Sequence, residues 1–156
     1  MINGKVVSLF MTPYGGDKMI SADHLSCLAG AGIEGDRYAQ GTGTYSKKPE
    51  PGRQLTFIEI EALEALKHFP DISCLAEQCR RNVISQGIRL NSVVGKIISI
   101  GTVELKVHRR CQPCGYLEGK LRKPGLKDAL WDKGGVRCAI LNDGKITVEN
   151  NISLVE

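Results

Sequence analysis

Residues 93–107 read VVGKIISIGTVELKV, two runs rich in Val, Ile and Leu on either side of Gly101 and Thr102. β-Branched residues favour the pleated backbone of a strand, and glycine favours the turn between strands. The stretch therefore predicts strands over 93–100 and 103–107. Comparable runs predict further strands over residues 5–11, 53–58, 82–85, 136–141 and 145–148.

Turn and helix signals complete this pattern. Asp143-Gly144 stands between the last two runs and is a strong signal for a two-residue β-hairpin. Residues 59–67 combine helix formers with apolar residues at helical spacing, and shorter helices are predicted over 71–79 and 126–131. Many short strands with few helices predict a mainly β fold with α insertions, in the form of a barrel.

The stretch 30–52 is rich in Gly, Ser, Thr, Lys and Pro and is expected to be a long loop. Loops of this length inside a compact domain are usually functional or mobile, and glycine lets the backbone approach a ligand closely. The sequence contains neither G-x-G-x-x-G after a strand nor a G-x-x-x-x-G-K-[ST] loop. A nucleotide-binding fold is therefore disfavoured.

The composition fits one soluble globular domain over residues 1–156, with 42% hydrophobic and 24% charged residues. No internal repeat or low-complexity tract is visible. The first ten residues lack the basic leader and cleavage site of an export signal, and no apolar run reaches the length of a membrane span. We therefore expect a cytoplasmic location, no membrane association and reduced cysteines.

The formal charge of +4 is modest and spread along the chain, and aromatic residues make up only 5%. Nucleic-acid binders usually concentrate basic residues on one face and add aromatic side chains where single strands stack. Nucleic acid is therefore disfavoured as a partner, and a local basic pocket for a small anion is favoured.

The pair Cys111-Gln112-Pro113-Cys114 directly follows the basic run 106–110. Nearby positive charge favours the thiolate, the form of cysteine that attacks electrophiles and binds soft metals. The pair is a candidate reactive site, with a thiol–disulfide couple, half of a zinc site and two inert buried thiols as open alternatives. The four other cysteines form no second close pair: Cys74 and Cys79 lie in a helical pattern and are expected to be core residues, and Cys27 and Cys138 belong to no motif.

Several short motifs occur in a specific order between about residues 30 and 142. They are GIEGDR at 32–37, RQ at 53–54, RRNV at 80–83, GIRLN at 87–91, VGK at 94–96, IGTVEL at 100–105, CQPC at 111–114 and GGVR at 134–137. With these motifs the chain resembles the MOSC family, named after the C-terminal domain of molybdenum-cofactor sulfurases. The resemblance implies a β-barrel with short helices, in agreement with the strand pattern.

The resemblance also implies that the protein binds the molybdenum cofactor, a pterin that carries a phosphate and a dithiolene-bound molybdenum. The family's metal-ligating cysteine corresponds to Cys114, with Cys111 as a supporting thiol. The implied activity is reduction of N-hydroxylated small molecules with electrons from a donor protein. In the alternative, Cys114 carries a persulfide received from a cysteine desulfurase, because this chain has no room for a pyridoxal-phosphate domain.

The same resemblance assigns the other candidate residues. Arg37, Arg53 and Arg80 lie on motifs expected to meet at the cofactor, where their forked donors suit a phosphate and a pterin. Asn82 is suited to the pterin edge or to closing a turn. Asp36 is suited to acid–base catalysis or to an ion pair with the adjacent Arg37.

The chain departs from the family pattern at two places. Tyr38 stands where many relatives have a histidine, and a phenol replaces an imidazole only partly in proton transfer. Residues 149–151 read ENN where relatives commonly have a Gly-Asp pair, so the final turn must be built differently. Neither departure affects Cys114. A thiol–disulfide or zinc-binding module that uses Cys111 and Cys114 remains the contrasting interpretation.

Overall fold

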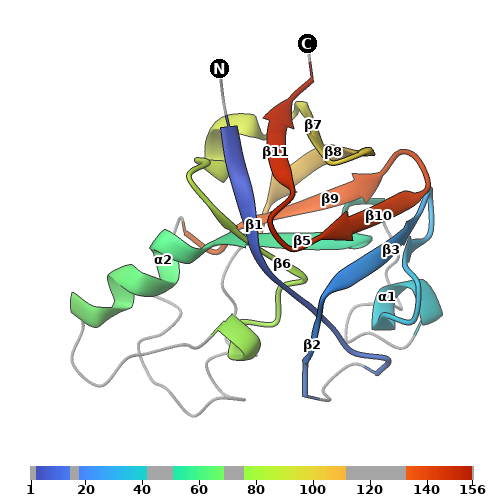
Figure 1. Cartoon of the computed structure of the whole chain (residues 1–156), viewed down its shortest axis with the longest axis horizontal. Helices are drawn as coiled ribbons and strands as arrows, with labels where there is room; N and C mark the ends of the chain where they lie inside the picture. Colours follow the sequence, from blue (N-terminus) through green and yellow to red (C-terminus); the bar gives the residue numbers. More distant parts are fainter. Residues whose placement is uncertain (1–2, 15–17, 42–50, 69–75, 112–132, 156) are drawn as a thin grey trace.

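The computed structural model describes residues 3–14, 18–41, 51–68, 76–111 and 133–155 (Figure 1). The strands are β1 (Asn3–Met11), β2 (Ile20–Ala22), β3 (His24–Leu28), β4 (Gly32–Ile33), β5 (Leu55–Glu59), β6 (Val83–Gln86), β7 (Ile97–Ile100), β8 (Val103–Arg110), β9 (Val136–Ile140), β10 (Gly144–Thr147) and β11 (Asn151–Leu154). The helices are α1 (Arg37–Gln40) and α2 (Ile60–Glu64). Four 3-10 turns are η1 (Pro51–Arg53), η2 (Ala65–His68), η3 (Ala76–Gln78) and η4 (Leu90–Val93).

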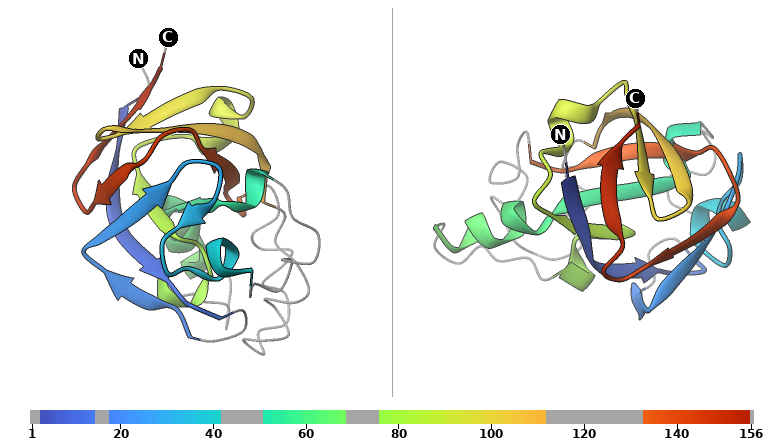
Figure 2. Two further views of the ribbon diagram at one scale, coloured as in Figure 1. Left: turned by 90° about the vertical axis from the view of Figure 1, so that its right-hand side faces the viewer. Right: turned by 45° about the horizontal axis from the view of Figure 1, so that its top comes forward.

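Seven strands close into a barrel in the order β11-β7-β8-β9-β5-β6-β1, because β1 also pairs with β11. The β5–β6 pair is parallel, and the other barrel pairs are antiparallel. β2 extends the sheet beyond β1, and β10, β3 and β4 form a separate small sheet. The first and last strands therefore lie side by side, and both termini emerge together (Figure 2). The prediction of a mainly β fold with a barrel is confirmed.

Strand β1 closes the barrel by changing partners along its length. It pairs with β11 through residues 3–5, with β6 through residues 5–9 and with β2 through residues 9–11. Its register with β6 shifts between Val6 and Ser8. Such a bulge bends a strand and increases its twist. β1 can therefore pair with β11 and β6 in the barrel and with β2 beyond it.

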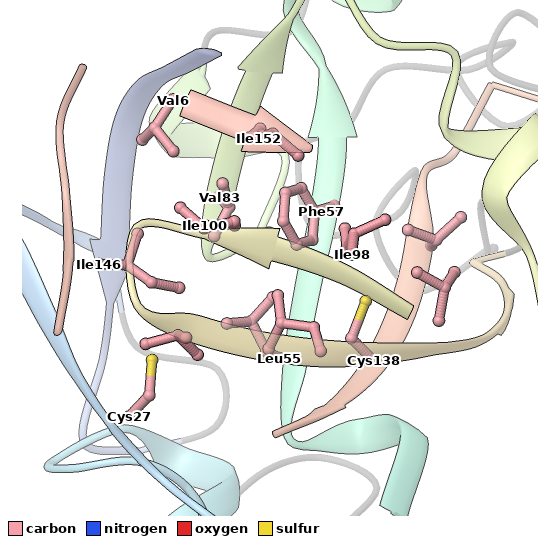
Figure 3. Packing of buried hydrophobic residues seen from close by; sticks show 14 of the residues in the cluster. Val6, Cys27, Leu55, Phe57, Val83, Ile98, Ile100, Cys138, Ile146 and Ile152 are labelled. Carbon is pink, nitrogen blue, oxygen red and sulfur yellow. The ribbon is translucent and has the colours of Figure 1, made fainter. Parts of the chain in front are cut away.

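The barrel interior is filled by apolar side chains from alternating strand positions (Figure 3). Leu55 and Phe57 of β5 point inward, as do Ile98 and Ile100 of β7. A second cluster lies outside the barrel, where Ile58 and Ile84 pack with Leu63 and Leu66 of the α2–η2 segment. β5 is consequently buried on both faces, which explains its nearly continuous apolar sequence.

Most sequence-predicted elements are found close to their expected positions. The strands expected over 5–11, 53–58, 82–85, 103–107, 136–141 and 145–148 correspond to β1, β5, β6, β8, β9 and β10. The helix expected over 59–67 forms α2 and continues as η2. Within the described part of the chain, no helix is long and apolar enough to cross a bilayer.

Other predictions need correction. The strand expected over 93–100 begins only at Ile97, because Val93 belongs to η4. The expected loop 30–52 contains β4, α1 and the start of η1, and its residues 42–50 lie outside the described residues. The strands β2, β3 and β11 were not predicted. Of the helix expected over 71–79, residues 76–78 form a 3-10 turn, and 71–75 lie outside the described residues. The helix expected over 126–131 also lies outside them.

The hairpin predicted at Asp143-Gly144 is wrong. β9 is paired on both sides, with β8 and β5, and has no free edge for β10, which pairs with β3 instead. Polar side chains hold the connecting segment: Asn142 Oδ1 accepts the N–H of Glu104 at 2.7 Å, and Asp143 Oδ1 accepts that of Ala29 at 2.8 Å. These residues link two sheets and do not close a tight turn between paired strands.

Candidate functional site

A buried polar network joins the ends of β1, β5 and β6 to the start of α1, and Asp36 is at its centre. The Asp36 side chain is fully buried, and its Oδ1 accepts hydrogen bonds from the backbone N–H of Thr12 at 3.1 Å and from Asn82 Nδ2 at 3.4 Å. Among the residues that the structure describes, Oδ2 has no hydrogen-bond partner. A buried carboxylate oxygen without a donor is costly, so this atom is a candidate contact for a bound group.

Arg37 supplies the positive charge that faces this carboxylate. Its Nη1 donates to Asp36 Oδ1 at 3.1 Å, and its Nη2 donates to the carbonyl oxygen of Arg80 at 3.3 Å. The Arg37 side chain is almost completely buried. The ion pair weighed for Asp36 and Arg37 is therefore present, and it fixes the segment around Arg80 relative to α1.

Asn82 connects three strands through its side chain. Its Nδ2 donates to the carbonyl oxygen of Phe10 at 3.1 Å as well as to Asp36, and its Oδ1 accepts from both the N–H and the hydroxyl of Thr56 at 3.1 Å. An amide side chain has two donor and two acceptor positions, so all of them are used inside the protein. The prediction that Asn82 binds a pterin edge stays a prediction, and such binding would have to replace one of these bonds.

Arg80 has a left-handed backbone, with φ of 63°. A side chain in this region costs about 1 to 2 kcal/mol, and such strain clusters at functional sites. The residue is only 8% exposed, and its Nη2 atom is buried. The strained backbone therefore belongs to a residue whose carbonyl oxygen contacts Arg37 and whose guanidinium group reaches into the interior.

We predict that Arg80→Ala is less stable than Arg80→Gly by about 1 kcal/mol. Both variants lose the guanidinium group, but only alanine retains a Cβ at a φ of 63°. Urea denaturation of the two variants measures the difference. Arg89, with φ of −85°, is the matched control, because there alanine should be the more stable replacement. Equal stability of the two Arg80 variants would show that the backbone is unstrained.

Further arginines lie on the outer face of the barrel beside this network. Arg137 of β9 pairs in register with Thr56 of β5 on one side and with Arg109 of β8 on the other. A Cβ built on Gly52, in η1, would lie 3.8 Å from the Cβ of Arg137. Arg53 directly follows Gly52 in the chain and therefore lies near this contact. The structure therefore gathers Arg53, Arg109 and Arg137 near Thr56. Arg109 and Arg137 were not among the predicted site residues, although both lie in or beside motifs of the sequence.

Cys111 lies at the end of β8, where it meets the segment that leads into β9. Its N–H donates to the carbonyl oxygen of Gly135 at 2.7 Å, and its side chain is buried. Arg81 Nε donates to the adjacent carbonyl oxygen of Gly134 at 3.0 Å. The Cys111 end of β8 and the segment of Arg80 and Arg81 thus meet at the same two glycines. Cys114 lies outside the described residues.

The other described cysteines are buried thiols with weak acidity. Burial raises the pKa of Cys27 to about 12 and raises the pKa values of Cys79 and Cys138 as well. Cys111 is close enough to Cys79 and Cys138 to raise their pKa values further. These three cysteines are thiols at neutral pH, and the burial of Cys79 confirms that it is a core residue. The reactive role expected for Cys111 and Cys114 stays a prediction. Cys74 lies outside the described residues.

Within the described ranges, no group of three or more His, Cys, Asp or Glu side chains could hold a metal ion. What the described residues provide is a buried Asp36–Arg37 pair, whose second carboxylate oxygen lacks a donor, and three further arginines with buried guanidinium nitrogens, Arg53, Arg80 and Arg137. This donor set suits a ligand with an anionic group and N–H donors, as a pterin phosphate has. The described residues are thus chemically compatible with the anionic part of the predicted cofactor, and the predicted metal ligand Cys114 lies outside them.

Comparisons with known proteins agree on the fold. The MOSC domain model matches residues 44–153, which include Arg53, Arg80, Asn82, Cys111 and Cys114. Similar solved structures are the YUAD protein from Bacillus subtilis, with a TM-score of 0.80 and 18% identity over 97% of this chain and 95% of that chain, and YiiM from Escherichia coli, with a TM-score of 0.69 and 21% identity over 97% and 70%. YiiM from Geobacillus stearothermophilus has a TM-score of 0.72 and 19% identity over 98% and 75%. No curated protein matches the sequence.

Proposed function

Because the chain belongs to the MOSC domain family, we propose that it binds the molybdenum cofactor and reduces N-hydroxylated small molecules, with Cys114 as the protein ligand of the metal. The observation that carries the proposal is the buried Asp36–Arg37 pair, in which Asp36 Oδ2 has no donor among the described residues, together with the buried guanidinium nitrogens of Arg53, Arg80 and Arg137. When bound, the cofactor supplies a molybdenum centre that takes oxygen from an N–OH group.

The arginines are proposed to hold the anionic part of the cofactor. Arg53, Arg80 and Arg137 each have a buried side-chain nitrogen, and charge-assisted hydrogen bonds are strong where water is excluded. The guanidinium of Arg37 is directed at Asp36 and at the carbonyl of Arg80. We therefore propose that Arg37 contributes mainly by positioning Arg80, while Arg53 and Arg80 face the cofactor.

Asp36 is proposed to act through Oδ2. This oxygen has no donor among the described residues, so it is available to accept an N–H of a pterin or to hold a proton for the substrate. Reduction of an N–OH group to N–H and water consumes two electrons and two protons. A partner protein must supply the electrons, and a carboxyl group at Oδ2 is suited to deliver a proton.

The test is elemental and pterin analysis of protein produced in a host that makes the cofactor. Wild type and Cys111→Ser are expected to contain molybdenum and pterin, and Cys114→Ser is expected to lose the molybdenum. Cys111→Ser is the matched control, because it changes a neighbouring sulfur to the same residue. Zinc that is lost equally from both variants would overturn the proposal in favour of a zinc-binding module.

Sulfur transfer is distinguished by mass spectrometry of the same proteins. If the protein is a sulfur carrier, incubation with a cysteine desulfurase and cysteine adds one sulfur atom to wild type and none to Cys114→Ser. If the protein gains this sulfur atom and contains no molybdenum, its function is persulfide transfer and not cofactor-dependent reduction.

A further inference from the structure

A cavity of about 660 Å³ lies at the end of β5 that is farther from Arg53. Glu59 ends β5 and Glu61 follows it in α2, and both contribute to the wall together with Arg89 and Lys133. The volume is within the range of small-molecule sites, roughly 300 to 1,000 Å³. From Leu55 to Glu59 an extended strand covers about 13 Å, so the two carboxylates lie at the opposite end of β5 from Arg53, while Lys133 directly precedes Gly134, the residue whose carbonyl oxygen Arg81 contacts.

The two carboxylates are held in place by the backbone of the segment after β6. Glu61 Oε2 accepts the N–H of Gly87 at 2.8 Å, and Glu59 Oε2 accepts the N–H of Leu90 at 3.3 Å. These bonds fix the orientation of both side chains and use one oxygen of each. Among the residues that the structure describes, the other oxygen of each carboxylate has no hydrogen-bond donor and is open to a ligand.

The two cations of the cavity make no ion pair with these carboxylates among the described residues. Arg89 and Lys133 are nevertheless near enough to act on Glu59: burial raises the pKa of Glu59 and the charge of Glu61 raises it further, whereas Arg89 and Lys133 lower it. The cavity therefore contains two carboxylates and two cations that share one space without direct pairing.

This charge pattern selects among classes of ligand. A simple anion would be repelled by Glu59 and Glu61, and a simple cation by Arg89 and Lys133. A molecule with separated positive and negative groups satisfies both pairs at once. We propose that the cavity binds a zwitterionic small molecule of the amino-acid or short-peptide class, with its ammonium group at Glu59 and Glu61 and its carboxylate at Arg89 and Lys133.

The proposal does not depend on cofactor binding, and it is tested on the whole protein by NMR titration. Glycine, diglycine and triglycine are added to ¹⁵N-labelled protein, because each residue lengthens the separation of the two charges by up to about 3.5 Å. At least one of them should give saturable shifts of the Gly87 and Leu90 amide signals, whose N–H groups donate to the two carboxylates. N-acetyl and C-amide forms of the best peptide should bind about tenfold more weakly or worse, since each lacks one charge.

Lys133→Gln should weaken the best peptide about tenfold, and Lys145→Gln, an exposed position on β10, should leave its affinity unchanged. The proposal is overturned if no peptide gives saturable shifts up to about 10 mM. It is also overturned if the blocked peptides bind as tightly as the zwitterion, or if the two lysine variants behave alike.

Discussion

Replacement of Gly135 by alanine should lower the free energy of unfolding by more than about 3 kcal/mol, and the variant should be largely unfolded if the native protein is only marginally stable. A Cβ at Gly135 would overlap the carbonyl oxygen of Phe57, and it would lie 2.8 Å from the carbonyl carbon of that residue and 3.1 Å from the Cα of Ile58. Gly135 also has a φ of 93°, which side-chain-bearing residues rarely adopt.

The clash cannot be relieved cheaply because it involves backbone on both sides. Phe57 is a central residue of β5 with a fully buried side chain, and Gly135 immediately precedes β9. Gly30→Ala is the control, since Gly30 also has a positive φ, 71°, but no atom lies within 4 Å of the position that its Cβ would take. It should cost only about 1 kcal/mol in urea denaturation. Similar losses for both variants would show that conformational strain, and not the contact with β5, explains the glycine.

Asp36→Ala is expected to lower the free energy of unfolding by about 3 to 5 kcal/mol, because it leaves the buried charge of Arg37 without its counter-charge. The same change removes the acceptor for the N–H of Thr12 and for one N–H of Asn82. The network joins β1, β5, β6 and α1, so its loss affects several elements together.

A double-mutant cycle separates the charge pair from the rest of the network. Arg37→Met alone should be destabilising, and the double variant Asp36→Ala/Arg37→Met should lose much less stability than the sum of the two single losses. The measurement is chemical denaturation of the wild type and the three variants. Additive losses would mean that Asp36 and Arg37 do not stabilise each other, despite their 3.1 Å separation.

Parts of the candidate site could be predicted because their signals are local. Asp36 and Arg37 are adjacent in the sequence, and their expected ion pair forms. The predicted core character of Cys79 is also confirmed, and burial raises its pKa. The clustering of Arg109 and Arg137 could not be derived in this way, because it depends on the pairing of β8 with β9.

The sequence alone determined the mainly β character of the chain, most of its strands and the helix after β5, since side-chain periodicity and β-branching act over a few neighbouring residues. Tertiary structure alone decided that β10 pairs with β3, that Gly135 lies against Phe57, and that Arg80 has a positive φ. Strand partners and strained backbone depend on contacts between residues far apart in the chain. A local signal such as Asp143-Gly144 is overruled when both edges of the preceding strand are already paired.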